Sequence, residues 1–203
     1  VVRARNRRSV WQIKVINPMN RFLLIVLSVV GLVATTGAQN KQGMNKVQNS
    51  KTLVAYFSAT GTTARAAEKV AKITGGELYA ITPAQSYTPA DLDWNNSQSR
   101  SSVEMNDPKS RPALKGKKEN IADYDVIFIG YPIWWNLAPR IINTFIESHD
   151  LKGKTIIPFA TSGSSAITGS AAALKKSYPA LNWKEGRLLN RADEKSMRAW
   201  LGK

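Results

Sequence analysis

A cluster of hydroxyl side chains follows a short apolar segment near residue 57, and this combination is suited to binding an anion. The apolar residues 53–57 are followed by Ser58, Thr60, Gly61, Thr62 and Thr63, after which a helical pattern begins. The first N–H groups of a helix have no partner inside it, and Ser and Thr hydroxyls add further donors. The Lys of a P-loop and the glycine spacing of a dinucleotide-binding loop are both missing. The sequence therefore predicts a phosphate site built from backbone and hydroxyl donors.

Two later loops carry side chains that suit a flat aromatic ligand. The first follows the apolar segment 125–130 and contains Pro132, Ile133, Trp134, Trp135 and Asn136. The second follows the segment 154–160 and contains Thr161, Ser162 and Gly163. Each loop alone has an ordinary explanation, because hydroxyls cap helices, Trp pairs pack in cores and Thr-Ser-Gly forms turns. Three such loops, each after its own apolar segment, are a more specific pattern.

No other set of side chains points as clearly to chemistry. The chain has no Cys, which excludes dithiol redox chemistry and Cys-based metal sites. Its single His, His149, lies at the end of an expected helix beside Asp150, which favours a structural role. Arg65 and Arg140 lie close to the loops in sequence. Either could approach a phosphate, although an exposed position on a helix explains both.

The three loops depend on an alternation of strands and helices. Apolar segments predict strands at 52–57, 77–82, 125–130, 154–160 and, more weakly, 183–189. Amphipathic segments predict helices at 62–74, 139–149, 165–178 and 193–201. Continuous apolar strands separated by helices indicate an α/β fold with a doubly wound parallel sheet covered on both faces. Ligands bind such sheets at the C-terminal ends of the strands, where the three loops would meet.

A segment of 41 residues, 83–123, interrupts this alternation. Residues 88–91 (Thr-Pro-Ala-Asp) are typical of a helix start, so we expect a polar helix that ends near residue 105. Its few apolar anchors would be Leu92, Trp94 and Val103. Long loops in compact domains often act as functional lids, and weak packing is the alternative explanation.

The N-terminal part has the pattern of an export signal. Met19 is followed by a basic residue, an apolar run at 22–33 and small residues at 36–38, which predict a signal peptide at 19–38 cleaved after Ala38. Residues 1–18 would be an upstream extension, 39–50 a flexible linker and 51–203 the folded domain. The run is shorter than the roughly 20 residues that span a bilayer, so an uncleaved anchor is the lesser alternative. We expect a periplasmic or secreted protein.

The net charge of +15 does not by itself indicate a partner. Residues 1–38 hold six basic and no acidic residues, which leaves 23 basic and 14 acidic residues and a net charge of +9. Such a charge can favour nucleic acid, anionic lipid or acidic proteins. The basic residues are scattered and are not interleaved with aromatic ones, so we expect a solvated basic surface and no specific binding of nucleic acid.

Taken together, the three loops make the segment from residue 51 to the end similar to the flavodoxin family. The resemblance is closest to a bacterial flavodoxin-like branch, through residues 130–135 (Gly-Tyr-Pro-Ile-Trp-Trp) and 161–164 (Thr-Ser-Gly-Ser). It implies a five-stranded sheet in the order 2-1-3-4-5 and noncovalently bound FMN. The residues that match the family's phosphate and ring-contacting loops are Ser58, Thr60, Gly61, Thr62, Thr63, Pro132, Ile133, Trp134, Trp135, Asn136, Thr161, Ser162 and Gly163. No metal and no catalytic side chain is implied.

The resemblance implies that a flavin performs the redox chemistry, and three functions are compatible with it. Electron-carrier flavodoxins are typically acidic, whereas this chain is basic, so the leading hypothesis is an FMN-dependent oxidoreductase that reduces a small acceptor such as a quinone with an external electron donor. The alternatives are a one-electron carrier that docks redox proteins and a domain that binds no cofactor. We expect Trp134 or Trp135 to cover one face of the ring. Asn136 could contact the ring or cap a turn.

Overall fold

The computed structural model describes residues 50–190 and 192–203. The expected extension at 1–18, the signal peptide at 19–38 and the linker up to residue 49 lie outside the described residues and stay predictions. Within the described part, every helix is too short or too polar to cross a bilayer.

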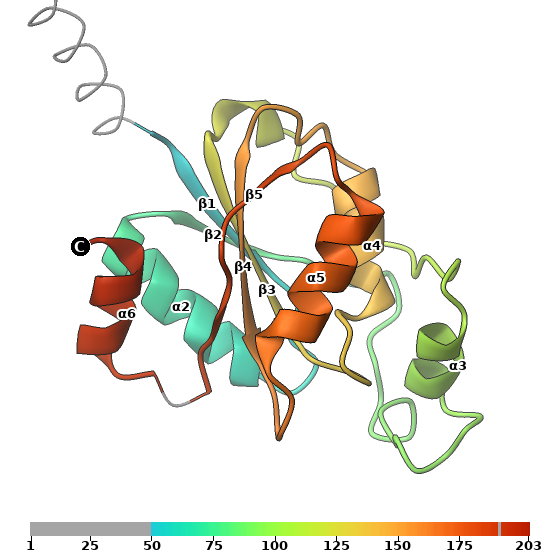
Figure 1. Cartoon of the computed structure of the whole chain (residues 1–203). Coiled ribbons are helices and arrows are strands. Elements are labelled where there is room, and N and C mark those ends of the chain that lie inside the picture. The colour runs from blue at the N-terminus through green and yellow to red at the C-terminus, as the bar shows by residue number, and fades with distance from the viewer. Residues whose placement is uncertain (1–49, 191) are drawn as a thin grey trace, which may run out of the picture. The chain divides into compact units, whose positions relative to one another are not determined.

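The centre of the domain is a parallel β-sheet in the order β2-β1-β3-β4-β5 (Figure 1), which is the order that the family resemblance implies. All strand pairs in it run parallel. Its strands are β1 (Thr52–Tyr56), β2 (Glu77–Ala80), β3 (Val126–Pro132), β4 (Thr155–Thr161), β5 (Asn182–Trp183) and β6 (Arg187–Leu188). The fold class expected from the sequence is confirmed.

The expected fifth strand at 183–189 is split into β5 and β6, which both pair with β4. Pro158 lies in the middle of β4 and has no N–H to donate to the next strand. The hydrogen bonds from Lys184 N–H to Ile156 O and from Leu189 N–H to Ala160 O, both 2.8 Å long, therefore lie on either side of this gap. A proline in β4 is the physical reason for the interruption.

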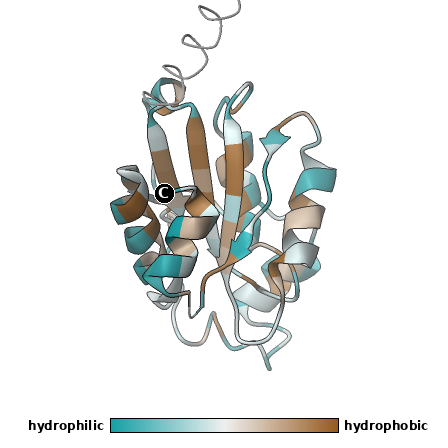
Figure 2. Cartoon of the chain, turned by 60° about the vertical axis from the view of Figure 1, so that its left-hand side comes forward, coloured by the Kyte–Doolittle hydropathy of each residue, from teal (hydrophilic) through white to brown (hydrophobic). Residues whose placement is uncertain are grey.

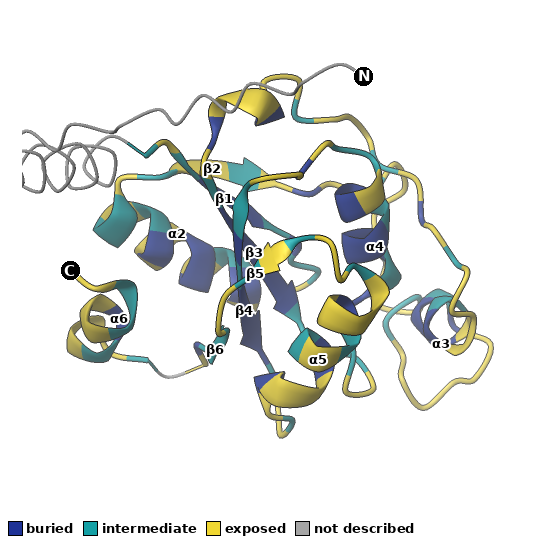
Figure 3. Ribbon diagram, turned by 45° about the horizontal axis from the view of Figure 1, so that its top comes forward, coloured by how far each residue is buried: buried dark blue, intermediate teal, exposed yellow. Residues whose placement is uncertain are grey.

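Helices cover both faces of the sheet. One core cluster packs α2 (Thr62–Thr74) and α6 (Glu194–Leu201) on one face, and a second packs α4 (Arg140–Glu147) and α5 (Ile167–Ser177) on the other. Figure 2 shows the apolar strands between more polar helices, and Figure 3 shows the buried sides of α2 and α4 turned toward the sheet. Four apolar residues of α4, Ile141, Ile142, Phe145 and Ile146, are all buried.

The long helix expected between residues 88 and 105 does not form. Thr88 and Asp91 make the expected capping hydrogen bonds, but only one turn follows. The side chains of Asp93 and Asn96 then accept hydrogen bonds from the backbone two residues further on, which favours turns over a helix. The helix in this segment, α3 (Arg100–Asn106), is short and is followed by the 3-10 turn η1 (Ile121–Asp123). Trp94 and Val103 were expected to be anchors but are exposed.

Candidate functional site

The loop between β1 and α2 leaves several hydrogen-bond donors without protein partners. Gly61 precedes α2 with a left-handed φ of 85°, a conformation that glycine adopts without strain. The first turn of α2 contains no acidic residue and no side-chain cap. The Oγ of Ser58 is shielded from solvent and makes no hydrogen bond, the only such buried side-chain atom among the described residues. The loop thus has free hydrogen-bond donors, and no group in the described part of the protein accepts from them. A bound anion could do so.

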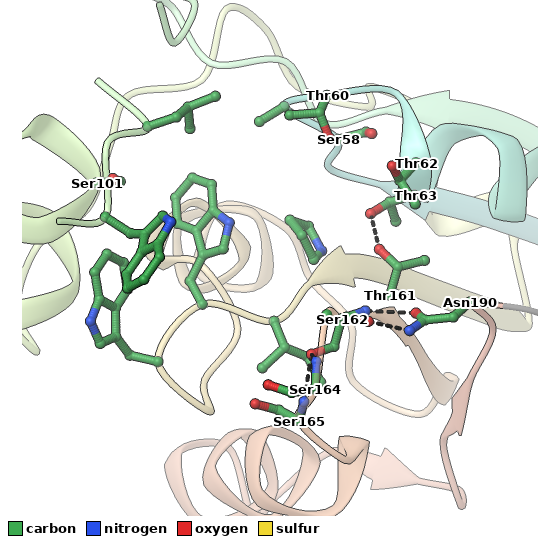
Figure 4. A pocket seen from close by; sticks show the side chains of 18 residues that line it. Ser58, Thr60, Thr62, Thr63, Ser101, Thr161, Ser162, Ser164, Ser165 and Asn190 are labelled. Atoms are coloured by element: carbon green, nitrogen blue, oxygen red, sulfur yellow. Dashed lines mark hydrogen bonds between the residues drawn. The ribbon is translucent and has the colours of Figure 1, made fainter. Parts of the chain in front are cut away.

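The first loop contacts the third through a pair of buried hydroxyl groups. Thr63 Oγ1 and Thr161 Oγ1 lie 2.8 Å apart, and both residues are buried. The hydroxyl of Ser162 accepts hydrogen bonds from the backbone N–H groups of Ser164 and Ser165. The end of β4 is therefore fastened to the start of α2 (Figure 4).

The second loop is a tight hairpin that separates the two tryptophans. Trp134 and Leu137 exchange two backbone hydrogen bonds of 3.0 and 2.9 Å, and the two residues between them, Trp135 and Asn136, have left-handed φ angles of 45° and 61°. Trp134 packs edge-on against Phe57, with ring centroids 5.7 Å apart. Trp135 remains 47% exposed. Trp134 is partly buried and packs against the core, whereas Trp135 is presented to solvent. Which of the two indoles would cover a flat ligand stays a prediction.

These three loops line one pocket with a volume of about 850 Å³. This volume lies within the range of roughly 300–1,000 Å³ that is usual for small-molecule sites. Eleven of the residues expected from the sequence line it, namely Ser58, Thr60, Thr62, Thr63, Pro132, Ile133, Trp134, Trp135, Thr161, Ser162 and Gly163. Gly61 and Asn136 do not line it and instead occupy left-handed backbone positions at the two turns. The turn role considered for Asn136 is the one that the geometry favours.

Seven residues line the pocket although the sequence analysis did not select them. Ala59, Ser164 and Ser165 lie inside the loops already identified. Leu92, Trp94 and Ser101 come from the stretch between β2 and β3, where no strand-end pattern marks them, and Asn190 directly follows the weaker strand expected at 183–189. None of the eighteen lining residues carries a formal charge. The pocket consequently offers hydroxyls, amides and aromatic surface, without a charged side chain.

The wall that contains Leu92, Trp94 and Ser101 is held in place by contacts of α3. Arg100 Nε donates to Glu104 Oε1 at 2.7 Å, and the guanidinium lies 4.0 Å above the ring of Tyr87. The hydroxyl of Tyr87 donates to the other oxygen of Glu104. Burial, and then this hydrogen bond to Glu104, raise the pKa of Tyr87 well above its ordinary value. The phenol therefore stays protonated and keeps its role as a donor.

The three other polar residues considered from the sequence do not line the pocket. Arg140 Nη2 donates to Met105 O at 2.8 Å, so this side chain joins the start of α4 to the end of α3. His149 Nε2 accepts from the N–H of Lys118, and Nδ1 lies 2.7 Å from Phe145 O. These two contacts give His149 the structural role that was expected. Arg65 contacts the hydroxyl of Thr62 at 3.4 Å and is exposed.

Asn190 fixes the third loop, and we expect its replacement by Asp to loosen that loop. The N–H of Ser162 donates to Asn190 Oδ1 at 2.7 Å, and Asn190 Nδ2 donates back to Ser162 O. A carboxylate cannot make the second bond, so Asn190→Asp should lower the free energy of unfolding by about 1 kcal/mol. Urea titration measures this loss. Asn182→Asp is the matched control, because Asn182 is exposed and its amide contacts only Thr155 Oγ1, at 3.2 Å, outside the pocket. If Asn182→Asp lowers the free energy of unfolding as much as Asn190→Asp does, Asn190 has no special role in fixing the third loop.

Known proteins are similar to this chain in sequence and in fold. The sequence profile of the flavodoxin family matches residues 51–203. A protein from Bacteroides eggerthii assigned as a flavoprotein is 77% identical, with a TM-score of 0.75 and coverage of 76% of this chain and 97% of its own. A similarly assigned protein from Bacteroides uniformis is 62% identical, with a TM-score of 0.74 and coverage of 76% and 99%.

A more distant structure shares the fold. It is a flavoprotein from Lactobacillus acidophilus in complex with FMN, 21% identical, with a TM-score of 0.60 and coverage of 75% of this chain and 99% of its own. No curated protein sequence matches the chain. The profile match over three quarters of the sequence and the two Bacteroides structures confirm the resemblance seen in the loops. The chain belongs to the flavodoxin family.

Proposed function

We propose that this protein binds FMN noncovalently in the pocket at the ends of β1, β3 and β4 and uses it to reduce a small acceptor such as a quinone. The observation that carries the proposal is the unpartnered Oγ of Ser58 beside the uncapped start of α2. Buried polar groups normally find a partner, so an orphaned hydroxyl at a helix N-terminus supports a bound anion. The FMN complex of the Lactobacillus acidophilus protein, which shares the fold, supports the same ligand.

The residues present fit the two ends of FMN. Ser58, Thr60 and Thr62 would donate to the phosphate together with the first N–H groups of α2, and no carboxylate lies in that turn to repel it. Trp135 would shield one face of the ring from water. The small residues Ser162 and Gly163 would let the backbone approach the polar edge of the ring.

When bound, FMN supplies the redox chemistry, and the protein sets its orientation and access. A quinone would take up two electrons and two protons and leave as the hydroquinone, while an external reductant such as a pyridine nucleotide loses the same two electrons. The basic net charge of +9 beyond residue 38 supports an enzyme over an acidic electron carrier.

The proposed activity is tested with FMN-loaded protein, a reduced pyridine nucleotide and 2-methyl-1,4-naphthoquinone. We expect oxidation of the nucleotide that depends on the quinone and exceeds the rate with the same concentration of free FMN. Loaded protein that gives no rate above free FMN with NADH or NADPH would contradict the enzymatic proposal. That result would not contradict the proposal that the protein binds FMN, because FMN binding is measured separately.

A further inference from the structure

Two exposed indole rings line the same pocket, and they come from separate segments of the chain. Trp94 is 72% exposed and Trp135 is 47% exposed, and both are among the few large hydrophobic residues that the described chain leaves open to solvent. Both contribute to the lining of the pocket. Large aromatic side chains are usually buried, so two exposed ones at one cavity point to a ligand that covers them.

Trp94 is presented by a backbone that is fixed by hydrogen bonds. Asp91 caps the turn at Thr88, and its carbonyl accepts the N–H of Ser101 at 2.9 Å. The carboxylate of Asp93 accepts the N–H of Asn95 at 3.0 Å. Hydrogen bonds from Thr88 hold the pKa of Asp91 below its ordinary value, so this cap is charged at neutral pH. The backbone that carries Trp94 is therefore fixed beside the pocket.

Trp135 is held in a conformation that costs free energy. Its φ of 45° is left-handed, and such angles are uncommon for bulky side chains. The two backbone hydrogen bonds between Trp134 and Leu137 impose this angle on the turn. An Asn, Asp or Gly would suit the position better, so the strain favours a role for the indole itself.

The position of Trp94 separates it from the phosphate end of the pocket. Leu92 and Trp94 belong to the segment before α3, and Ser101 lies in the first turn of α3 itself; neither is one of the three strand-end loops. In Figure 4, Ser101 lies across the pocket from Thr60 and Thr62. The hydroxyl-rich end and the side of the pocket marked by Ser101 thus lie on different sides of one cavity, which leaves the Ser101 side available to a second ligand.

We propose that Trp94 forms the acceptor-binding side of the pocket, while Trp135 shields the flavin ring, and that Trp94 selects flat, uncharged aromatic acceptors of the quinone class. This assignment depends on the proposed FMN function. Indole faces attract flat rings by stacking, which explains the preference for planar acceptors. No charged side chain lines the pocket, so a charged acceptor would lose its hydration without gaining an ion pair there. Trp94 is then the residue that determines specificity without holding the cofactor.

The test measures two affinities in the same variants. FMN-loaded wild type, Trp94→Ala and Trp94→Phe are dialysed against 2-methyl-1,4-naphthoquinone without a reductant, and FMN affinity is measured separately by flavin fluorescence. We expect Trp94→Ala to weaken quinone binding by roughly five- to tenfold, Trp94→Phe to restore most of it, and FMN affinity to stay within about twofold. Val103→Ala is the control, because Val103 is another exposed apolar residue of the stretch between β2 and β3 and does not line the pocket.

Four other results would overturn the assignment of Trp94 to acceptor binding. Unchanged quinone binding in Trp94→Ala, with FMN retained, would overturn this assignment and leave the proposed function intact. A parallel loss of FMN affinity would make Trp94 a flavin contact and would also overturn it. If Val103→Ala weakens quinone binding as much as Trp94→Ala does, the change reflects a general disturbance of this segment, which would also overturn the assignment. Wild-type protein that holds no FMN would overturn the proposed function, and this assignment with it.

Discussion

Thr62→Asp should abolish FMN retention while leaving the folded protein as stable as the wild type, or slightly more stable. Thr62 is the first residue of α2, whose first turn has neither an acid nor a side-chain cap. A carboxylate there interacts favourably with the helix dipole and should add about 0.3–1 kcal/mol to the free energy of unfolding. The same carboxylate would lie beside the phosphate, where a like charge at about 4 Å costs roughly 4 kcal/mol and lowers affinity more than 100-fold.

Thr62→Asp should raise the stability of the protein and lower its affinity for FMN. An ordinary helix end would show only the gain in stability, so the two measurements together identify a ligand site. Urea unfolding measures stability, and flavin fluorescence titration measures affinity. Thr168→Asp is the matched control, since Thr168 is an exposed residue in the first turn of α5, which also lacks an acid, and does not line the pocket. It should gain similar stability and keep FMN. If Thr62→Asp binds FMN as tightly as the wild type does, the hydroxyl cluster serves the helix alone.

Gly130→Ala should destabilise the protein by about 3 kcal/mol, the upper end of the cost of overpacking a core. Gly130 lies in β3, and an added Cβ would be 2.1, 2.5 and 2.8 Å from three ring atoms of Phe159 on β4. Phe159 is fully buried, so its ring cannot swing out of the way. The midpoint of urea denaturation reports the loss.

Two further variants test whether the destabilisation by Gly130→Ala comes from the clash with Phe159. Phe159→Leu in the Gly130→Ala background should recover part of the lost stability, because the smaller side chain makes room for the methyl group. Gly169→Ala is the same chemical change in α5, where the nearest atom would be 3.6 Å away, and it should stabilise the helix by about 0.5–1 kcal/mol. A Gly130→Ala protein as stable as the wild type would mean that β3 and β4 pack differently from this structure.

The regular elements could be read from the sequence because their patterns are local. The apolar period and Gly75 delimit α2 at the residues predicted, and the continuous apolar runs identify β1, β3 and β4 to within two residues at each end. The strand-end positions of the three loops follow from the parallel topology. For that reason most of the pocket could be predicted before any geometry was available.

The remaining parts depend on contacts between distant segments. The capping pattern at Thr88 is real, but the Asp and Asn side chains after it stop the helix after one turn. The course of that loop brings Trp94 to the pocket, and no local pattern encodes it. The different exposure of Trp134 and Trp135 likewise depends on packing, because Phe57 and Tyr87 contact the first and leave the second exposed.

The absorbance spectrum of the purified protein, recorded after added FMN has been removed by desalting, tests the central claim most directly. The pocket with its unpartnered Ser58 hydroxyl and uncapped helix predicts that one flavin per chain remains and gives a yellow protein. A colourless protein that releases no flavin on denaturation would contradict the claim that these three loops form an FMN site.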